Sequence, residues 1–292
     1  MKGAIRVLLI GAGKMGRNHL RLLRANPRFE VLGIVDPDPA VQAICEGREH
    51  WWPRYPHLGG AFDAVVVASP SVYHIRARGF AFHRIPTLVE KPLALSSNEA
   101  GDFLTSTVSP FIVVGHVERF NPAARALRKA LESLGEIRSV EAYRSGGAAI
   151  PADAILPNIV FDLAVHDIDI CRRLFGPLRL EDNAVFEHGA YLWLRSSAGA
   201  RLSIVVGRGQ GPKRRCMSVI GSRGIARVDY IEQTLAVDGA AIPVEKDEPL
   251  RAELNAFATF VETGERGDLC SAEDGAAAVL LCEQALTPRG YV

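Results

Sequence analysis

The stretch Gly11-Ala12-Gly13-Lys14-Met15-Gly16 stands between a short apolar run, Arg6–Ile10, and a segment with apolar residues at helical spacing, Met15–Asn26. In a strand–turn–helix unit, the first glycine of G-x-G-x-x-G permits the tight turn. The second lets the backbone approach a pyrophosphate, and the third lets helix and strand pack closely. The amino terminus of the helix offers N–H groups and a partial positive charge to the phosphates. The stretch therefore predicts a dinucleotide-binding unit.

Asp36 closes the next apolar run, Glu30–Val35, 20 residues after Gly16. A carboxylate at this place can accept hydrogen bonds from both hydroxyls of an adenosine ribose. A 2′-phosphate would be repelled by it, and Pro37-Asp38-Pro39 supplies no cation to offset the repulsion. The expected cofactor is therefore NAD, with NADP disfavoured. The alternative is a glycine turn followed by an ordinary surface aspartate.

Short apolar runs continue through the first third of the chain, at Ala64–Ala68, Thr87–Val89 and Phe111–Val114. Runs that are apolar on both faces and separated by helical patterns predict a parallel sheet covered on each side. The stretch Glu49–Gly60 breaks this rhythm and is predicted to be a loop, so the usual third strand is not visible there.

Beyond about residue 117 the pattern changes to helices mixed with successive half-polar strands. The predicted helices are Asn121–Ser133, Pro157–Phe175, Leu250–Glu262 and Ala272–Ala285, and the predicted strands are Glu136–Tyr143, Asn183–Glu187, Tyr191–Arg195, Arg201–Val206, Cys216–Ile220 and Ala226–Tyr230. The predicted fold class is α/β. A Rossmann domain with a doubly wound parallel sheet spans residues 1–117, and an α+β domain on an open, mainly antiparallel sheet spans residues 118–292.

The composition narrows the possible partners of this 292-residue chain. Lys plus Arg total 34 against 33 for Asp plus Glu, a balance that argues against nucleic-acid and anionic-membrane partners. Five scattered cysteines without C-x-x-C spacing indicate reduced thiols, and neither a disulfide framework nor a metal site is expected. No apolar run approaches the length of a membrane helix. The expected location is the cytoplasm.

Glu90-Lys91-Pro92 ends one of the apolar runs, at the sheet edge where doubly wound folds bind their ligands. A lysine there can polarise a substrate oxygen or exchange a proton with it. As a bare tripeptide it is better explained as a solvated lysine before a loop, so the functional interpretation depends on its context.

Asp162, His166 and Asp169 occupy positions i, i+4 and i+7 of one predicted helix, so they share a face. A carboxylate four residues before a histidine can fix its tautomer and raise its basicity, which suits a general base. Metal ligation by Asp162 and His166, or a buried structural histidine, are the alternatives.

Basic residues cluster around the Gly207–Pro212 loop, at Arg208, Lys213, Arg214 and Arg215. This cluster is suited to a phosphate group. A solvated hairpin loop is nevertheless the favoured interpretation, and phosphate binding is the alternative.

Taken together, these motifs resemble the glucose–fructose oxidoreductase / inositol dehydrogenase / rhizopine-catabolism (Gfo/Idh/MocA) family. The resemblance rests on Gly11–Gly16, Asp36, Ala68-Ser69-Pro70 with His74, Glu90-Lys91-Pro92, and Asp162-x-x-x-His166-x-x-Asp169. It implies an NAD(P)-dependent oxidoreductase acting on sugars, cyclitols or nucleotide sugars, and a homodimer or homotetramer formed through the C-terminal sheet. It implies catalytic roles for Lys91, His166 and Asp162, and cofactor binding by Gly11, Gly13, Lys14, Met15, Gly16, Asp36, Ser69, Pro70, His74 and Glu90.

Two stretches, Val114–Pro122 and Asp162–Asp169, resemble a narrower branch that includes UDP-N-acetylglucosamine 3-dehydrogenases. This resemblance implies NAD-dependent oxidation of a sugar hydroxyl on a nucleotide sugar. The substrate-binding residues expected from it are Lys91, Arg119, Asn121, Asp162 and His166, with Arg119 facing the diphosphate. Leu156-Pro157-Asn158 replaces a glycine pair that many members carry. The alternatives are a dehydrogenase or reductase of a free sugar or cyclitol, and a non-catalytic NAD-binding regulator.

Overall fold

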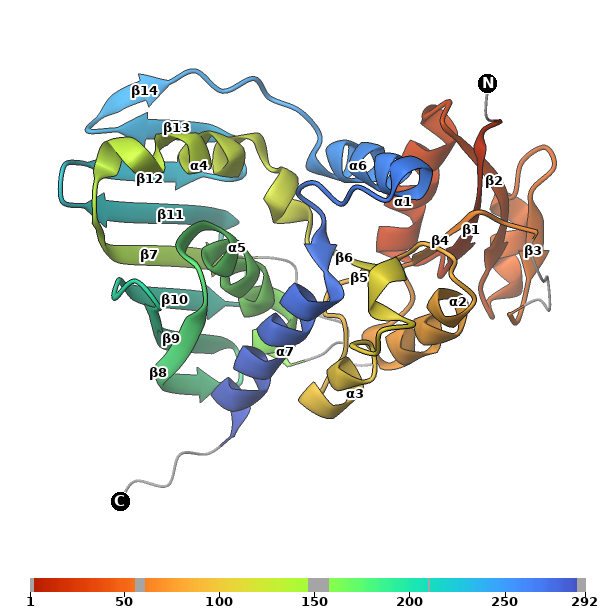
Figure 1. Ribbon diagram of the computed structural model, residues 1–292, viewed down its shortest axis with the longest axis horizontal. Coiled ribbons are helices and arrows are strands. Elements are labelled where there is room, and N and C mark those ends of the chain that lie inside the picture. Colours follow the sequence, from red (N-terminus) through yellow and green to blue (C-terminus); the bar gives the residue numbers. More distant parts are fainter. Residues whose placement is uncertain (1–2, 56–60, 147–157, 210, 288–292) are drawn as a thin grey trace. The chain divides into compact units, whose positions relative to one another are not determined.

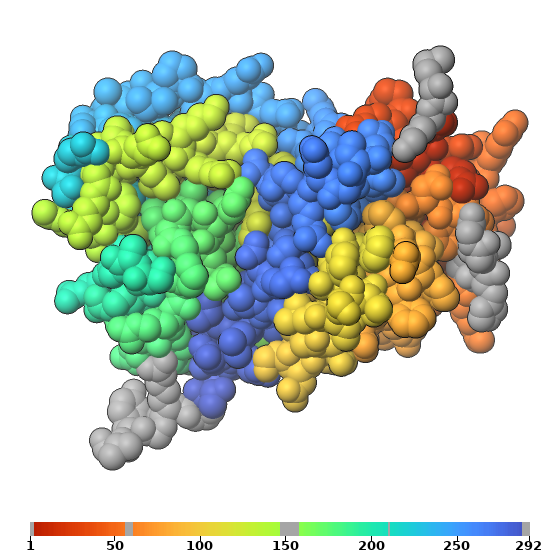
Figure 2. All heavy atoms as spheres, viewed as in Figure 1, coloured from red at the N-terminus to blue at the C-terminus, as the bar shows by residue number. Residues whose placement is uncertain are grey.

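The computed structural model describes residues 3–55, 61–146, 158–209 and 211–287, which are coloured by residue number as a ribbon in Figure 1 and as spheres in Figure 2. The chain divides into two compact units. The first comprises Met1–His116 and Leu250–Ala276, and the second comprises Val117–Pro249 and Ala277–Val292. Leu156 and Pro157, two of the three residues that replace the glycine pair of many family members, lie outside the described residues.

The first unit is built on a seven-stranded sheet in the order β15-β6-β5-β4-β1-β2-β3. Its strands β1 to β6 pair in parallel, and β15 pairs antiparallel with β6. This confirms the predicted parallel Rossmann sheet. The elements in chain order are β1 (Ile5–Ile10), α1 (Lys14–Ala25), β2 (Phe29–Val35), η1 (Pro39–Ile44), β3 (His50–Trp52), β4 (Ala64–Val67), η2 (Ser71–Ala77), α2 (Arg78–Phe82), β5 (Thr87–Glu90), α3 (Ser97–Gly101), η3 (Ser109–Phe111) and β6 (Ile112–Gly115).

The core of this unit lies along the central strands. Every residue of β4, β5 and β6 is buried, which explains why these segments are apolar on both faces. Helix α1 turns Leu20 and Leu23 towards the sheet and leaves Arg17 and Arg21 exposed. The carboxyl ends of the parallel strands are thereby left as the polar edge of the unit.

The predicted loop Glu49–Gly60 contains a strand, so this part of the prediction is wrong. His50–Trp52 forms β3 and pairs in parallel with β2. Gly33 of β2 makes room for it, because a Cβ at Gly33 would collide with the ring of Trp52. The strand depends on this long-range fit and not on a local apolar pattern.

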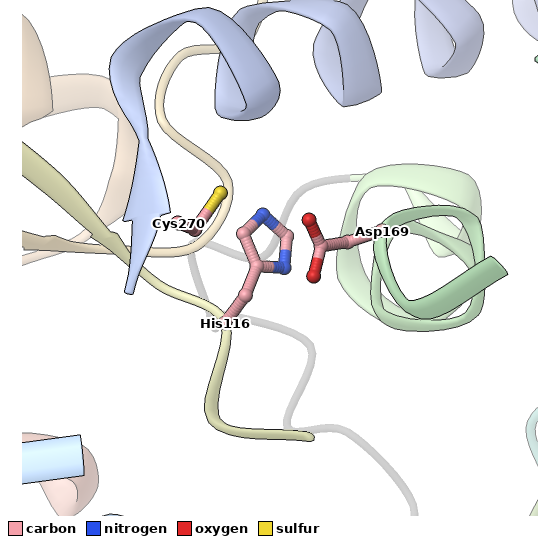
Figure 3. Close-up of side chains that lie close together, drawn as sticks. All are labelled: His116, Asp169 and Cys270. Carbon is pink, nitrogen blue, oxygen red and sulfur yellow. The ribbon is translucent and has the colours of Figure 1, made fainter. Parts of the chain in front are cut away.

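The segment Leu250–Ala276, which the sequence analysis places in the second domain, belongs to the first unit. It contains α6 (Pro249–Thr263), apart from the first residue of this helix, and β15 (Cys270–Ser271). Phe257 of α6 stacks on Phe29, with ring centroids 6.5 Å apart. Cys270 of β15 is paired with Val114 of β6, and Figure 3 shows Cys270 on β15. A return of the chain to its first sheet leaves no signature in local periodicity.

The second unit is built on an eight-stranded sheet in the order β14-β13-β12-β11-β7-β10-β9-β8. All its pairings are antiparallel except that of β7 with β10, which confirms the predicted open, mainly antiparallel sheet. Its elements are η4 (Val117–Phe120), α4 (Pro122–Leu134), β7 (Ile137–Ser145), η5 (Val160–Ala164), α5 (Val165–Phe175), β8 (Leu178–Phe186), β9 (Gly189–Ser196), β10 (Arg201–Gly207), β11 (Arg214–Gly221), β12 (Ile225–Asp229), β13 (Thr234–Val237) and β14 (Ala240–Ile242), and α7 (Ala272–Leu286) ends the described chain.

The two faces of this sheet differ in character. On β9, Leu192 and Leu194 are buried, whereas Tyr191 and Trp193, which alternate with them, are exposed and stacked on each other. This alternation is that of a sheet with one covered and one open face. Among the described residues, no helix is long and apolar enough to cross a membrane.

Candidate functional site

The turn after β1 packs the start of α1 directly against the sheet backbone. Gly11 has a φ of +89°, which glycine adopts without strain. A Cβ added to Gly16 would collide with the carbonyl oxygen of Gly11, so this helix packing requires glycine. Beside Gly13, in contrast, an added Cβ would meet nothing within 4 Å in the described part of the chain. The turn thus combines close packing with open space at the residue expected to face a pyrophosphate.

The amino terminus of α1 is suited to an anion. Its N-cap, Gly13, has no side chain that could accept hydrogen bonds from the first-turn N–H groups. That turn contains no acidic residue, and Lys14 is exposed in it while Met15 is half-buried. First-turn N–H groups, a positive helix end and a nearby lysine fit the pyrophosphate of a dinucleotide.

Asp36 is fixed at the end of β2 by the backbone around it. Its Oδ2 accepts a hydrogen bond from the N–H of Ala12 at 2.8 Å, and its Oδ1 accepts one from Asp38 at 2.9 Å. A carboxylate has about four acceptor positions, so both oxygens can still accept hydroxyl donors. This arrangement fits the ribose-binding role expected for Asp36, and it also ties the glycine turn to β2.

His74, expected at the cofactor, is buried in η2, and its ring lies between two backbone carbonyls. Nε2 is 2.9 Å from the carbonyl oxygen of Ser69, and Nδ1 is 2.8 Å from that of Pro92. Burial lowers the pKa of His74, opposed by these two carbonyls. The structure therefore gives His74 a role between two loops, while Ser69 and Pro70 lie at the end of β4, half-buried and exposed respectively.

Glu90, also expected at the cofactor, is directed towards α1. Its Oε1 lies 2.7 Å from Nε2 of His19, and both side chains are buried. Nδ1 of His19 has no hydrogen-bond partner among the described residues, which places the proton of a neutral ring on Nε2, facing Glu90. His19 is a residue that the sequence analysis missed. Its position between Gly16 and Leu20 on the buried face of α1 is the signal that could have revealed it.

The helix expected over Pro157–Phe175 begins, within the described residues, as a turn of π-helix, Val160–Ala164, and continues as α5. The change from the π turn to the α-helix therefore falls between Asp162 and His166. Asp162 lies in this π turn, and Nη2 of Arg208 donates a hydrogen bond to its Oδ2 at 2.7 Å. His166, half-buried, lies in the first turn of α5.

Arg119 and Asp169 form a buried pair in the second unit. Nε and Nη2 of Arg119 donate to the two carboxylate oxygens of Asp169 at 2.8 and 2.6 Å. Figure 3 shows Asp169 on α5. Arg119 as a whole residue is 5% exposed, which leaves little of it available for the expected diphosphate contact. A buried arginine held by a buried carboxylate anchors α5 to the segment before α4.

Asn121, expected at the substrate, is also a structural residue. It is 3% exposed and caps α4, accepting a hydrogen bond from the N–H of Ala123 at 3.1 Å. Its amide donates to Oε2 of Glu118 and to the carbonyl of Tyr230. These contacts occupy the side chain within the fold, so the expected substrate contact is not supported.

A second buried ion cluster, which the sequence analysis did not identify, surrounds Arg144. Its Nε donates to Asp167 at 2.7 Å, and its Nη1 donates to Glu118 at 3.1 Å. Burial works against the charge of Arg144, but Asp167 and Glu118 outweigh it and raise the arginine's pKa. Burial raises the pKa of Asp167, opposed by Arg144. The cluster fixes the amino-terminal half of α5 against β7.

Two members of the basic cluster approach these acidic residues. Arg208 binds Asp162, as above, and Nη1 of Arg215 lies 3.7 Å from Oε1 of Glu118. Partial burial and the charge of Arg144 lower the pKa of Arg215, while Glu118, Asp167 and Asp162 act in the opposite direction. Arg208 and Arg215 therefore bring positive charge to the part of the second unit that holds Asp162.

The expected site residues fall into two groups. Gly11, Asp36, Ser69 and Lys91 follow the carboxyl ends of β1, β2, β4 and β5 in the first unit, so the parallel sheet collects them at one edge. Asp162 and His166 lie close in sequence in the second unit. Lys91 is half-buried and directly follows Glu90, whose Oε2 accepts from the Lys91 N–H at 3.2 Å.

Comparison with protein families places the first unit among known dinucleotide-binding folds. Residues 5–109 match a family model described as an oxidoreductase family with an NAD-binding Rossmann fold. The UDP-N-acetylglucosamine 3-dehydrogenase of Acidithiobacillus ferrooxidans is 26% identical over 275 residues, which cover 88% of this chain and 87% of that protein. The inositol 2-dehydrogenase of Rhizobium meliloti is 26% identical over 271 residues, covering 86% and 78%.

Solved structures share the fold over nearly the whole chain. A structure of the A. ferrooxidans UDP-N-acetylglucosamine 3-dehydrogenase superposes with a TM-score of 0.84 at 23% identity, covering 97% of each chain. An oxidoreductase from Agrobacterium radiobacter, in complex with NAD⁺, L-tartaric acid and magnesium, superposes with a TM-score of 0.79 at 19% identity, covering 96% of this chain and 95% of that one.

Proposed function

The chain belongs to the Gfo/Idh/MocA family of oxidoreductases, and from this premise we propose that it is an NAD-dependent dehydrogenase of a sugar hydroxyl. The observation that carries the proposal is the single edge of the parallel sheet. There the glycine turn, Asp36 and Lys91 follow the carboxyl ends of β1, β2 and β5, which is where doubly wound sheets bind cofactor and substrate. A cofactor-binding turn and a lysine suited to hold an oxygen therefore share one edge.

The proposed catalytic residues are Lys91, His166 and Asp162. Bound NAD supplies the acceptor for the hydride that leaves the sugar carbon. Lys91 donates a hydrogen bond to the hydroxyl oxygen and favours its alkoxide character. His166 takes the hydroxyl proton, so that the alcohol becomes a ketone as the carbon loses its hydride. Asp162, held by Arg208, supplies negative charge that stabilises the protonated histidine.

The catalytic assignment is tested with Lys91→Ala and His166→Ala, assayed for NADH formation on nucleotide sugars, free sugars and cyclitols. Each variant should lower kcat about a hundredfold, the usual effect of losing a positioned acid or base. NAD binding should change little, because Gly11, Gly13 and Asp36 are untouched. His188→Ala, at a side chain that is 73% exposed in the same unit as His166, is the control.

Two results would contradict this proposal. Near-normal turnover by His166→Ala would remove the histidine from the role of base and leave the proton to Lys91. Tight NAD binding by the wild-type protein without turnover on any compound of the panel would favour the non-catalytic NAD-binding regulator.

We further propose a preference for NAD over NADP, because the Asp36 carboxylate would face a 2′-phosphate. The wild-type protein should show at least about a tenfold higher kcat/KM for NAD, equivalent to about 1.4 kcal/mol. Asp36→Asn keeps an amide oxygen that can accept from the Ala12 N–H but removes the charge, so it should narrow the preference. Equal wild-type values for the two cofactors would refute the proposal and direct attention to Arg17, which is exposed on α1.

The proposed substrate is a nucleotide sugar. The named relative from A. ferrooxidans supports this class, and the arginines of the second unit support it independently. Arg215 lies on the same face of β11 as the buried Met217 and Val219, and its side chain is 43% exposed. Arginine pairs two phosphate oxygens at once, which a free sugar cannot exploit. Arg215 and Arg208 therefore replace Arg119 as the proposed diphosphate ligands.

This substrate class is tested with Arg215→Ala, using Arg214→Ala on the opposite face of the same strand as the matched control. Loss of a charge-assisted contact worth about 1.5–3 kcal/mol should raise KM for the nucleotide sugar about tenfold or more and leave KM for NAD unaltered. Equal kcat/KM for the nucleotide sugar and for the same sugar without its nucleotide would overturn this proposal in favour of a free sugar or cyclitol.

We also propose that copies of the chain associate through the open face of the eight-stranded sheet into a homodimer or homotetramer. Tyr143, Phe186, Tyr191 and Trp193 are 40–60% exposed, and the last three form adjacent ring contacts. Aromatic residues of this kind are enriched at interfaces. Light scattering should report an assembly that Trp193→Lys dissociates and that Phe82→Lys, at an exposed residue of the first unit, leaves intact. A monomeric wild-type protein would refute the association.

A further inference from the structure

Two buried histidines of the first unit contact opposite ends of the tripeptide Glu90-Lys91-Pro92. His19, on α1, lies against the Glu90 side chain, and His74, in η2, lies against the Pro92 carbonyl. We propose that His19 and His74 are positioning residues that hold the backbone on either side of Lys91. The functional importance of this positioning rests on the catalytic role proposed for Lys91. Neither histidine touches the reacting atoms in this proposal.

The His19 contact reaches Lys91 through Glu90. The imidazole Nε2 lies 2.7 Å from Oε1, and Oε2 of the same carboxylate accepts from the Lys91 N–H at 3.2 Å. The glutamate also has little freedom to turn away, because a Cβ added to Gly115 of β6 would lie only 3.2 Å from its Oε1. A buried carboxylate deprived of a partner is costly, so Glu90 stays with His19. The helix that begins at the glycine turn is thereby linked to the backbone at Lys91.

The His74 contact spans two loops. Its Nδ1 meets the carbonyl of Pro92 at 2.8 Å, and its Nε2 meets that of Ser69 at 2.9 Å, so one ring joins the segments that follow β4 and β5. The ring is 1% exposed. A neutral imidazole donates from only one of its nitrogens, whereas both of these partners are acceptors. The contact to Pro92 is the one that bears on Lys91.

The chemical consequence is the placement of one ammonium group. Displacement of a catalytic group by about 1 Å can cost on the order of a hundredfold in rate, even when the altered residue lies away from the chemistry. Lysine has a long, flexible side chain. Its backbone must therefore be fixed if the Nζ atom is to occupy one defined position. Fixing both neighbours of Lys91 fixes the backbone from which this side chain extends.

Substitution by asparagine or by glutamine tests the two ring nitrogens of each histidine one at a time. An asparagine amide nitrogen can replace Nδ1, and a glutamine amide nitrogen can replace Nε2. His19→Gln should therefore keep the contact to Glu90, whereas His19→Asn should lose it. At His74 the order is reversed, because His74→Asn should keep the contact to Pro92 and His74→Gln should lose it. The exposed His83, substituted in both ways, is the control.

The four variants of the full chain are compared in steady-state kinetics and in lysine acetylation. His19→Asn and His74→Gln should lower kcat about tenfold to a hundredfold with little change in KM for NAD. The reverse pair, His19→Gln and His74→Asn, should stay close to wild type. In a brief acetic anhydride pulse analysed by peptide mass spectrometry, Lys91 should react faster in the two impaired variants, relative to the exposed Lys129.

The acetylation measurement needs no turnover, so it separates this inference from the proposed function. Absence of activity in the wild-type protein, combined with the crossed acetylation pattern, would refute the dehydrogenase and leave the positioning of Lys91 established. Equal behaviour of the Asn and Gln variants at both positions, or an unchanged Lys91 rate in all four, would overturn the inference. If a variant at one histidine fails to fold, the Asn and Gln variants at the other histidine test the inference.

Discussion

The close approach of Gly16 to the Gly11 carbonyl is the constraint on which the first unit depends. No side chain fits between them, so α1 lies directly on the turn that follows β1. Two contacts depend on this position. The N–H of Ala12 meets the Asp36 carboxylate, and His19 reaches Glu90 across the sheet edge. The ends of β1, β2 and β5 are thus linked through α1 and the turn before it. This linkage requires glycine at position 16 whether or not the residue touches a cofactor.

The second unit orders its helix by buried charge. Arg119 holds Asp169, and Arg144 holds Asp167, so two carboxylates of α5 are each held by an arginine from elsewhere in the unit. Buried ion pairs contribute little net stability over apolar packing, but removal of one partner is strongly destabilising. Such pairs specify one rotation of the helix, because any other would leave carboxylates without partners. His166, between Asp162 and these anchors in sequence, inherits a defined position from them.

The sequence was sufficient for what local pattern encodes, and insufficient for what depends on partners far along the chain. Apolar runs predicted the parallel strands, and half-polar runs predicted the open sheet. Strand β3 and the return of Leu250–Ala276 depend on distant contacts, such as Trp52 against Gly33. The sequence analysis expected Arg119 at the substrate. A motif shows that an arginine is present, but it does not show that this arginine binds the carboxylate of Asp169. The buried position of His19, in contrast, could have been predicted from the helical spacing of the apolar residues of α1.

Helix type, which residue spacing does not reveal, changes between Asp162 and His166. Asp162 lies in a turn of π-helix and accepts a hydrogen bond from Arg208, whereas His166 lies in the first turn of α5. This arrangement brings the charge of Arg208 to the residue that the proposed reaction uses to stabilise His166. A carboxylate shared between an arginine and a histidine stabilises the imidazolium less than an unshared one would, because part of its charge is already compensated. In the proposed reaction, Arg208 therefore offsets part of the negative charge that Asp162 offers to the protonated histidine.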